Sequence, residues 1–138
     1  MGQNKNTGRE GVVFGRRMAE LAFRHLGSEL LNTKTKSNET KFNGQIVVLK
    51  SAHKNTSSVG VTLNVLENIQ SIIAVLENKE KQEDGVHKYT LYKVPVEWYK
   101  QHMYPSRSSP SAAKTTRMVN CNPIRKNGEV IGELICDF

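Results

Sequence analysis

Lys50 and the polar residues after it carry the side chains that bind phosphate groups. Lys50 and Ser51 lie near the end of an apolar stretch, and the next six residues after Ala52 are HKNTSS. Lysine, hydroxyl and backbone N–H groups make most protein contacts to nucleic-acid phosphates. The alternative is that Lys50 only extends from an edge strand into solvent. We expect an anion site formed by Lys50, Ser51, His53, Lys54, Thr56 and Ser57.

A second group of basic side chains lies in residues 104–117, YPSRSSPSAAKTTR, where no acidic residue occurs. Serines and prolines separate the three cations Arg107, Lys114 and Arg117, which is typical of a flexible basic loop. Such a loop can follow a nucleic-acid backbone or enter a groove. The alternative is a solvated surface loop without a ligand.

Other chemistry finds little support in the residue types and their spacing. The four histidines do not have the spacing of metal ligands, and neither an HExxH motif nor paired CxxC motifs occur. Cys121 and Cys136 are the only cysteines, too few for a disulfide scaffold. We expect both to be buried thiols in a reducing cytoplasm. No nucleophile elbow, Walker loop or dinucleotide fingerprint is present, so no cofactor is expected.

The charge distribution favours a polyanionic partner. The net charge is +7, with ten basic and four acidic residues in 1–58 and eight basic and one acidic in 85–126. Between them, residues 67–84 hold five acidic and two basic residues. This pattern predicts one positive face, which would bind double-stranded DNA through counterion release. A protein–protein adaptor whose basic face meets an acidic partner is a further alternative.

The length of 138 residues and the 37% hydrophobic content predict one domain, residues 1–138. Within it we expect residues 1–8 to be a flexible N-terminus and 104–117 to be the basic flexible loop. No apolar run approaches the roughly 18 residues of a membrane helix, so no membrane partner is expected. A homodimer that binds a duplex symmetrically is a further expected partner arrangement.

Hydrophobic periodicity predicts the elements that must position these groups. Helices are expected at 9–26, 62–77 and 96–103, and strands at 28–34, 45–52, 88–94 and 118–122. The N-terminus of the 62–77 helix would reinforce the anion site after Lys50. Asn127-Gly128 predicts a C-terminal β-hairpin. This order indicates an α/β or α+β domain with a central mixed sheet flanked by helices.

The segment NGQIVVLKSA at 43–52 resembles the centre of the PD-(D/E)XK nuclease superfamily, the restriction-endonuclease-like proteins. With its flanking elements the resemblance covers residues 9–94, and it implies an α-β-β-β-α-β core that contacts DNA. In the family motif an acid stands two residues before a lysine on a strand. Both side chains then lie on one face, at a metal-bound phosphate. Lys50 matches the motif lysine.

The chain departs from this family at the acidic positions. Val48 stands where the motif has its second acid, and residues 40–42 before the turn contain no acid. An endonuclease would therefore use Lys50 as a catalytic residue with Glu39 and Glu20, which would also bind Mg²⁺. A hard cation lacks its usual anchors without a carboxylate pair. The leading prediction is thus a DNA-binding protein with a nuclease-like core, and a metal-dependent endonuclease is the alternative.

Overall fold

The computed structural model describes residues 5–28 and 38–138, with side chains from Val13 onward in the first helix. Its helices are α1 (Lys5–His25), α2 (Leu63–Asn68), α3 (Val96–His102), α4 (Pro110–Thr115) and α5 (Cys121–Asn127). Its strands are β1 (Glu39–Phe42), β2 (Gln45–Ala52), β3 (Ser58–Thr62), β4 (Ser71–Glu77), β5 (His87–Pro95), β6 (Tyr104–Pro105), β7 (Thr116–Asn120) and β8 (Glu129–Cys136).

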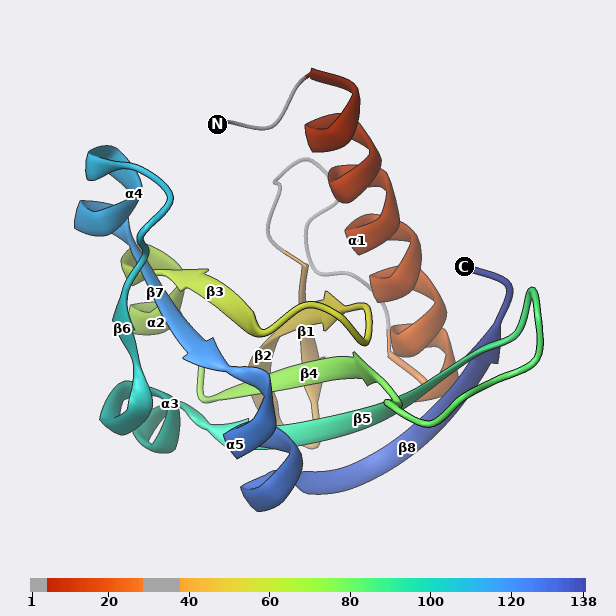
Figure 1. The fold of residues 1–138 in the computed structure, drawn as a ribbon. Helices are drawn as coiled ribbons and strands as arrows, with labels where there is room; N and C mark the ends of the chain where they lie inside the picture. The colour runs from red at the N-terminus through yellow and green to blue at the C-terminus, as the bar shows by residue number, and fades with distance from the viewer. Residues whose placement is uncertain (1–4, 29–37) are drawn as a thin grey trace.

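The strands form two sheets, which Figure 1 shows side by side. The larger sheet has the order β1-β2-β4-β5-β8, and the smaller sheet has the order β3-β7-β6. β2 and β4 run parallel, whereas the other neighbours in the larger sheet are antiparallel. The predicted mixed α/β fold with a central sheet is therefore confirmed.

β4 is the central strand of the larger sheet, and all seven of its residues are buried. A continuous apolar run of this kind is typical of a strand that is covered on both faces. Ile73 and Val75 belong to one hydrophobic core, and Ile72 and Leu76 belong to the other. The alternation of side chains along β4 therefore divides the interior into two layers.

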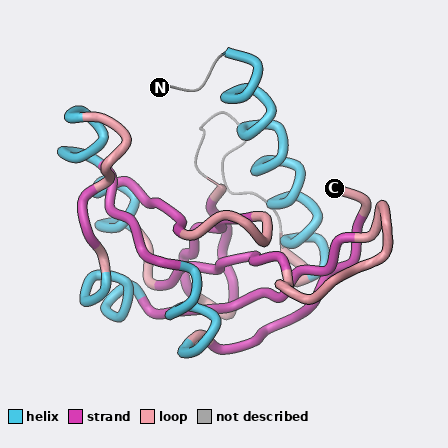
Figure 2. Tube along the Cα trace, in the orientation of Figure 1, coloured by secondary structure: helices cyan, strands magenta, loops and turns pink. Residues whose placement is uncertain are grey.

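α1 covers one face of the larger sheet, and the smaller sheet with its adjoining helices covers the other (Figure 2). Met18 and Phe23 of α1 pack in the same core as Val47 and Tyr89. On the opposite face, the buried Tyr99 of α3 joins the second core and donates its hydroxyl proton toward main-chain oxygens of the smaller sheet. The five-stranded sheet is thus the middle of three layers.

Four predicted elements agree with the structure. The helix at 9–26 lies within α1 apart from its last residue, the strand at 45–52 coincides with β2, the strand at 88–94 lies within β5, and the helix at 96–103 corresponds to α3. The strand at 118–122 corresponds to β7, shifted toward the N-terminus by two residues. The predicted strand at 28–34 lies outside the described residues from position 29 onward.

The predicted helix at 62–77 is wrong. β3 ends at Thr62, α2 has only six residues, and Ser71–Glu77 is the central strand β4. The broad apolar stripe of this segment fits a buried strand as well as a helix, and tertiary packing decides between them. No long helix therefore follows the polar loop after β2, and the expected N-terminal reinforcement of the anion site is absent there.

The predicted C-terminal hairpin is also wrong. Residues up to Asn127 form α5, and β8 pairs with β5 instead of with the preceding segment. Gly128 has an ordinary φ of −70°, so it does not form the predicted hairpin turn. A Cβ atom at Gly128 would lie 2.8 Å from Cβ of Tyr92. Close packing against β5 therefore explains this glycine.

Residues 104–117, expected to be one flexible loop, instead contain β6, α4 and the first residues of β7. Ser109 caps α4 by accepting a hydrogen bond from the N–H of Ala112 at 3.0 Å, and Pro110 begins the helix. Both features favour a helix start. Residues 5–8 of the expected flexible N-terminus lie in α1. Among the described residues, no helix is long and apolar enough to cross a membrane.

Candidate functional site

The carboxyl ends of the parallel strands β2 and β4 bring His53 and Glu77 together. Ala52 and Leu76 are the last paired residues of these two strands, and His53 and Glu77 follow them directly in the sequence. Glu77 pairs with Tyr89 of β5, and His87 begins the same strand two residues earlier. Because side chains two apart share a strand face, Tyr89 and His87 lie on the face covered by α1.

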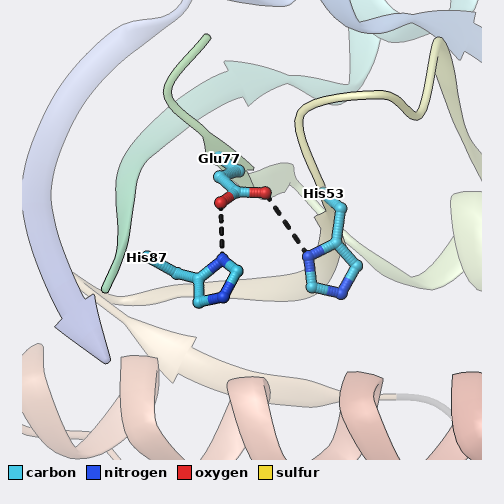
Figure 3. Close-up of side chains that lie close together, drawn as sticks. All are labelled: His53, Glu77 and His87. Carbon is cyan, nitrogen blue, oxygen red and sulfur yellow. Dashed lines mark hydrogen bonds and ion pairs between the residues drawn. The ribbon is translucent and has the colours of Figure 1, made fainter. Parts of the chain in front are cut away.

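His53 and His87 both direct Nδ1 toward the Glu77 carboxylate, as Figure 3 shows. His87 Nδ1 lies 2.7 Å from Oε2, and His53 Nδ1 lies 3.5 Å from Oε1. The ligand atoms of the three residues all lie within 4.8 Å of one another. Two imidazole nitrogens and a carboxylate oxygen in this arrangement are donors that divalent transition metals accept.

The Glu77 carboxylate is buried, whereas the two histidines reach solvent. The exposed fraction of the side chain is 4% for Glu77, 46% for His53 and 34% for His87. Burial by itself raises the pKa of Glu77, but the hydrogen bonds from Lys54 N–H and His87, with the charges of the histidines, outweigh it and lower the pKa. The carboxylate is therefore ionised at neutral pH.

Aromatic residues hold His53 in place. The rings of His53 and Phe14 of α1 stack with centroids 4.2 Å apart. The hydroxyl of Tyr89 lies 3.1 Å from His53 Nδ1 and donates to the main-chain oxygen of Phe138 at 2.8 Å. Burial raises the pKa of Tyr89, so this hydroxyl keeps its proton. α1, β5 and the C-terminal residue thus surround the histidine.

Cys136 lies on the strand next to His87. The two residues are cross-strand partners of β8 and β5. The thiol donates to the main-chain oxygen of Phe138 at 3.3 Å, and burial raises its pKa. Both cysteines of the chain are free thiols, as expected, although only Cys121 is fully buried.

Three residues with cationic side chains, from separate segments, lie at this end of the larger sheet. Lys54 follows His53, and its N–H donates to Glu77 Oε1 at 2.9 Å. Lys79 lies two residues after Glu77, and Arg125 of α5 donates from Nη2 to the Glu77 main-chain oxygen at 3.0 Å. Burial raises the pKa of Cys121, while the charges of Arg125 and Lys79 oppose this rise. Both cations therefore lie close to the first residue of α5.

The residues predicted to form one anion site are divided between two faces. Lys50 lies on the same sheet face as Val48, away from α1. Because side chains alternate along a strand, Ser51 and His53 lie on the opposite face, which α1 covers. The Lys50 side chain is half-buried, and burial lowers its pKa. The remaining predicted residues of the loop are exposed: Lys54, Thr56 and Ser57.

The residues proposed for a nuclease site are also separated. Glu39 is the cross-strand partner of Val48, so it lies on the same face as Lys50. The ion pairs among the described residues do not join Glu39 to Lys50. Glu20 is exposed on α1, which covers the opposite face of the sheet. The sheet itself therefore lies between Glu20 and Lys50.

The cations of residues 104–117 lie beside the smaller sheet. Arg117 of β7 donates to the main-chain oxygen of Ala113 at 2.8 Å, which fixes α4 to the strand. Arg107 lies over the ring of Tyr104, 5.1 Å from its centroid, and Lys114 is exposed on α4. Arg117 pairs with Val61 near the end of β3, away from the polar loop that precedes this strand. The two predicted basic groups are thus separate.

Sequence patterns identify His53 only as an anion-site residue, show no metal-ligand spacing among the histidines, and identify neither Glu77 nor His87. The predicted helix at 62–77 ends at Glu77, and His87 precedes the predicted strand at 88–94, so neither has a predicted neighbour. The sequence feature that these three residues share is a polar or titratable side chain at the boundary of a buried strand. Comparisons with family models, with curated proteins and with solved structures find no match for this chain.

Proposed function

We propose that this protein binds the phosphate backbone of double-stranded DNA through the cations at the carboxyl end of β4. The observation that supports the proposal is that Lys54, Lys79 and Arg125, from three separate segments, all lie beside Glu77: Lys54 through its main-chain N–H, Lys79 two residues along the chain, and Arg125 through its guanidinium. The net charge of +7 adds a long-range attraction for a polyanion. Phosphate contacts of this kind position a protein on a duplex without reading its sequence.

The loop between β2 and β3 supports the same proposal. Residues 53–57 are all exposed and include no acid. Their backbone is anchored at both ends, because Lys54 N–H donates to Glu77 and Ser57 accepts from Cys121 N–H at 2.8 Å. An anchored loop loses little entropy when it binds a ligand. Lys54, Thr56 and Ser57 can therefore serve as phosphate contacts at low entropic cost.

Salt-dependent titration of a short labelled duplex tests this function. The double variant Lys54→Ala/Lys79→Ala should lower the slope of log affinity against log salt by about two units. The matched control is Lys41→Ala/Lys100→Ala, which removes the same charge from two exposed lysines at the other end of the larger sheet. The control should lose much less affinity. An equal loss in both double variants, or no binding at low salt, would contradict the proposed surface.

A metal-dependent endonuclease remains a second proposal, because Glu39 and Lys50 share a sheet face. The test is cleavage of plasmid DNA in the presence of Mg²⁺. We expect no cleavage or only slow cleavage, since no acid stands at position 48 to fix the ion. Rapid cleavage that disappears in Glu39→Gln would support the endonuclease. Binding of an acidic protein instead of DNA would support the adaptor.

The free thiols of Cys121 and Cys136 suit a reducing compartment, and on this basis we propose the cytoplasm. Homodimer formation on a duplex is proposed only as a consequence of DNA binding. Sedimentation of the protein with and without the duplex measures it, and a one-to-one complex at saturation would contradict it.

A further inference from the structure

Among the described residues, the side chains within ion-pair distance of the buried Glu77 carboxylate belong to histidines, His53 and His87. Lys54 contributes only its main-chain N–H, and Arg125 contacts the main-chain oxygen of Glu77. A buried carboxylate is normally paired with a cation or bound to a metal.

The three donor groups have the geometry that a metal ion requires. In a tetrahedral zinc site, neighbouring ligand atoms lie about 3.3 Å apart, given metal–ligand distances near 2 Å. His87 Nδ1 lies 2.7 Å from Oε2 of Glu77, and His53 Nδ1 lies 3.5 Å from Oε1, while all the ligand atoms lie within 4.8 Å of one another. Both imidazoles present the same ring atom, Nδ1, to the carboxylate (Figure 3). After small side-chain shifts, a divalent ion could therefore take the place of the protons between the two imidazoles and the carboxylate.

Neighbouring groups hold these donors in position. The Lys54 N–H fixes one carboxylate oxygen at 2.9 Å, and the Phe14 ring stacks on His53. Such outer contacts orient the ligands of metal sites. The partial exposure of both histidines leaves a path for an ion from solvent.

We propose that His53, Glu77 and His87 bind one divalent transition-metal ion of the zinc class, with at least one coordination position left to solvent. Two imidazoles and one carboxylate favour Zn²⁺ or Fe²⁺ over Mg²⁺, which takes oxygen ligands. Three protein ligands with an open position are the arrangement of a catalytic metal, whereas structural zinc sites are usually closed by four. This site is independent of the proposed DNA binding, because it uses other side chains.

Calorimetric titration of the full chain with Zn²⁺ tests the proposal, with visible absorption of bound Co²⁺ as the spectroscopic readout. One ion per chain should bind, and Co²⁺ should give the intense bands of a four- or five-coordinate site. His53→Asn and His87→Asn should each weaken Zn²⁺ binding by more than about 100-fold, since even outer-shell changes cost about 10–100-fold. The variants should fold, because both histidines are partly exposed.

His102→Asn is the matched control, because His102 is exposed on α3 and stacks on Trp98 at the far end of β4 and β5. This control and Cys136→Ser should retain one-to-one binding with unchanged affinity. Circular dichroism of each metal-free variant checks the fold. If one variant does not fold, the other histidine variant carries the test. Absent Zn²⁺ binding, or binding that survives both His53→Asn and His87→Asn, would overturn the proposal, as would binding lost in Cys136→Ser.

Discussion

The two ends of the buried strand β4 carry polar groups of different kinds. At its carboxyl end lie His53, Glu77 and His87, which we name the imidazole end. At its amino end lie Gln45, Gln70 and Ser71, which we name the amide end. Ser71 Oγ donates to Gln45 Oε1 at 3.0 Å, and Gln70 exchanges main-chain hydrogen bonds with Ile46 and Val96.

The comparison shows two ways to end a buried strand. The groups of the amide end are neutral: Gln45 Oε1 accepts a hydrogen bond from the Ser71 hydroxyl, and Gln70 Oε1 accepts one from the Ile46 N–H. The imidazole end holds a buried carboxylate whose nearest cationic partners are histidines. Neutral amides need no further ligand, whereas a carboxylate keeps a charge that a cation can balance. The difference identifies the imidazole end as the place where an ion or a charged ligand would act.

The largest predicted difference between the ends is in stability. Glu77→Ala should lower the free energy of unfolding by about 2–3 kcal/mol, because it removes an acceptor for three donors and leaves a buried cavity. Ser71→Ala should cost about 1 kcal/mol, the value of one hydrogen bond. Urea denaturation of both variants at neutral pH measures the difference. Equal costs at the two ends would mean that the carboxylate has no special role in the fold.

A smaller effect separates the two sheet faces near the imidazole end. Burial lowers the pKa of Lys50, so the charged amine is less favourable in the folded than in the unfolded chain, and it reduces stability at pH values below its ordinary pKa, neutral pH included. Lys50→Met should therefore raise the free energy of unfolding by on the order of 1 kcal/mol, which is close to the contribution of one buried methylene group.

The matched control is Lys54→Met, at an exposed position, which should leave stability nearly unchanged. In DNA titrations we expect the opposite ranking of the two variants, with the larger effect in Lys54→Met. Lys54→Met should lower the salt slope by about one unit, and Lys50→Met should leave it unchanged. A destabilised Lys50→Met would show that the Lys50 amine has a favourable partner.

The smallest effect concerns the C-terminal residues beside His53. Arg17 of α1 lies over the Phe138 ring, 4.0 Å from its centroid, and pairs with Asp137 at 3.8 Å. Both partners of the ion pair are largely exposed, so Arg17→Ala should cost less than about 1 kcal/mol. Zn²⁺ should still bind one ion per chain in this variant. A large loss of stability would mean that the C-terminal contact helps to form the imidazole end.

Sequence reasoning succeeded where local pattern determines the element. The amphipathic α1 and the branched strand β2 have periodicities that few other structures share. It failed where packing decides. SIIAVLE matches a helix by pattern, but it pairs with β2 and β5 as a strand whose faces are covered by α1 and by the smaller sheet. Asn127-Gly128 matches a hairpin turn, but β8 pairs with β5.

These two errors explain why only part of the candidate site was predicted. Sequence patterns identify His53 for phosphate binding, at the correctly predicted end of β2, and not as a partner of a carboxylate. Glu77 joins it only through the parallel pairing of β2 and β4, and His87 joins through the antiparallel pairing of β4 and β5. Long-range strand pairing of this kind leaves no signal in residue spacing along the chain. The charge of +7 predicted a polyanionic partner, but it did not indicate which cations converge.

The most direct test of the difference between the two ends is a two-dimensional NMR titration of the full chain with Zn²⁺. We predict shifts that saturate at one equivalent of Zn²⁺ for the amide signals of His53, Lys54, Glu77 and His87. The signals of Gln45, Gln70 and Ser71 at the amide end should stay unchanged. Shifts centred on His102 or the amide end, or no saturable shift at the imidazole end, would contradict it.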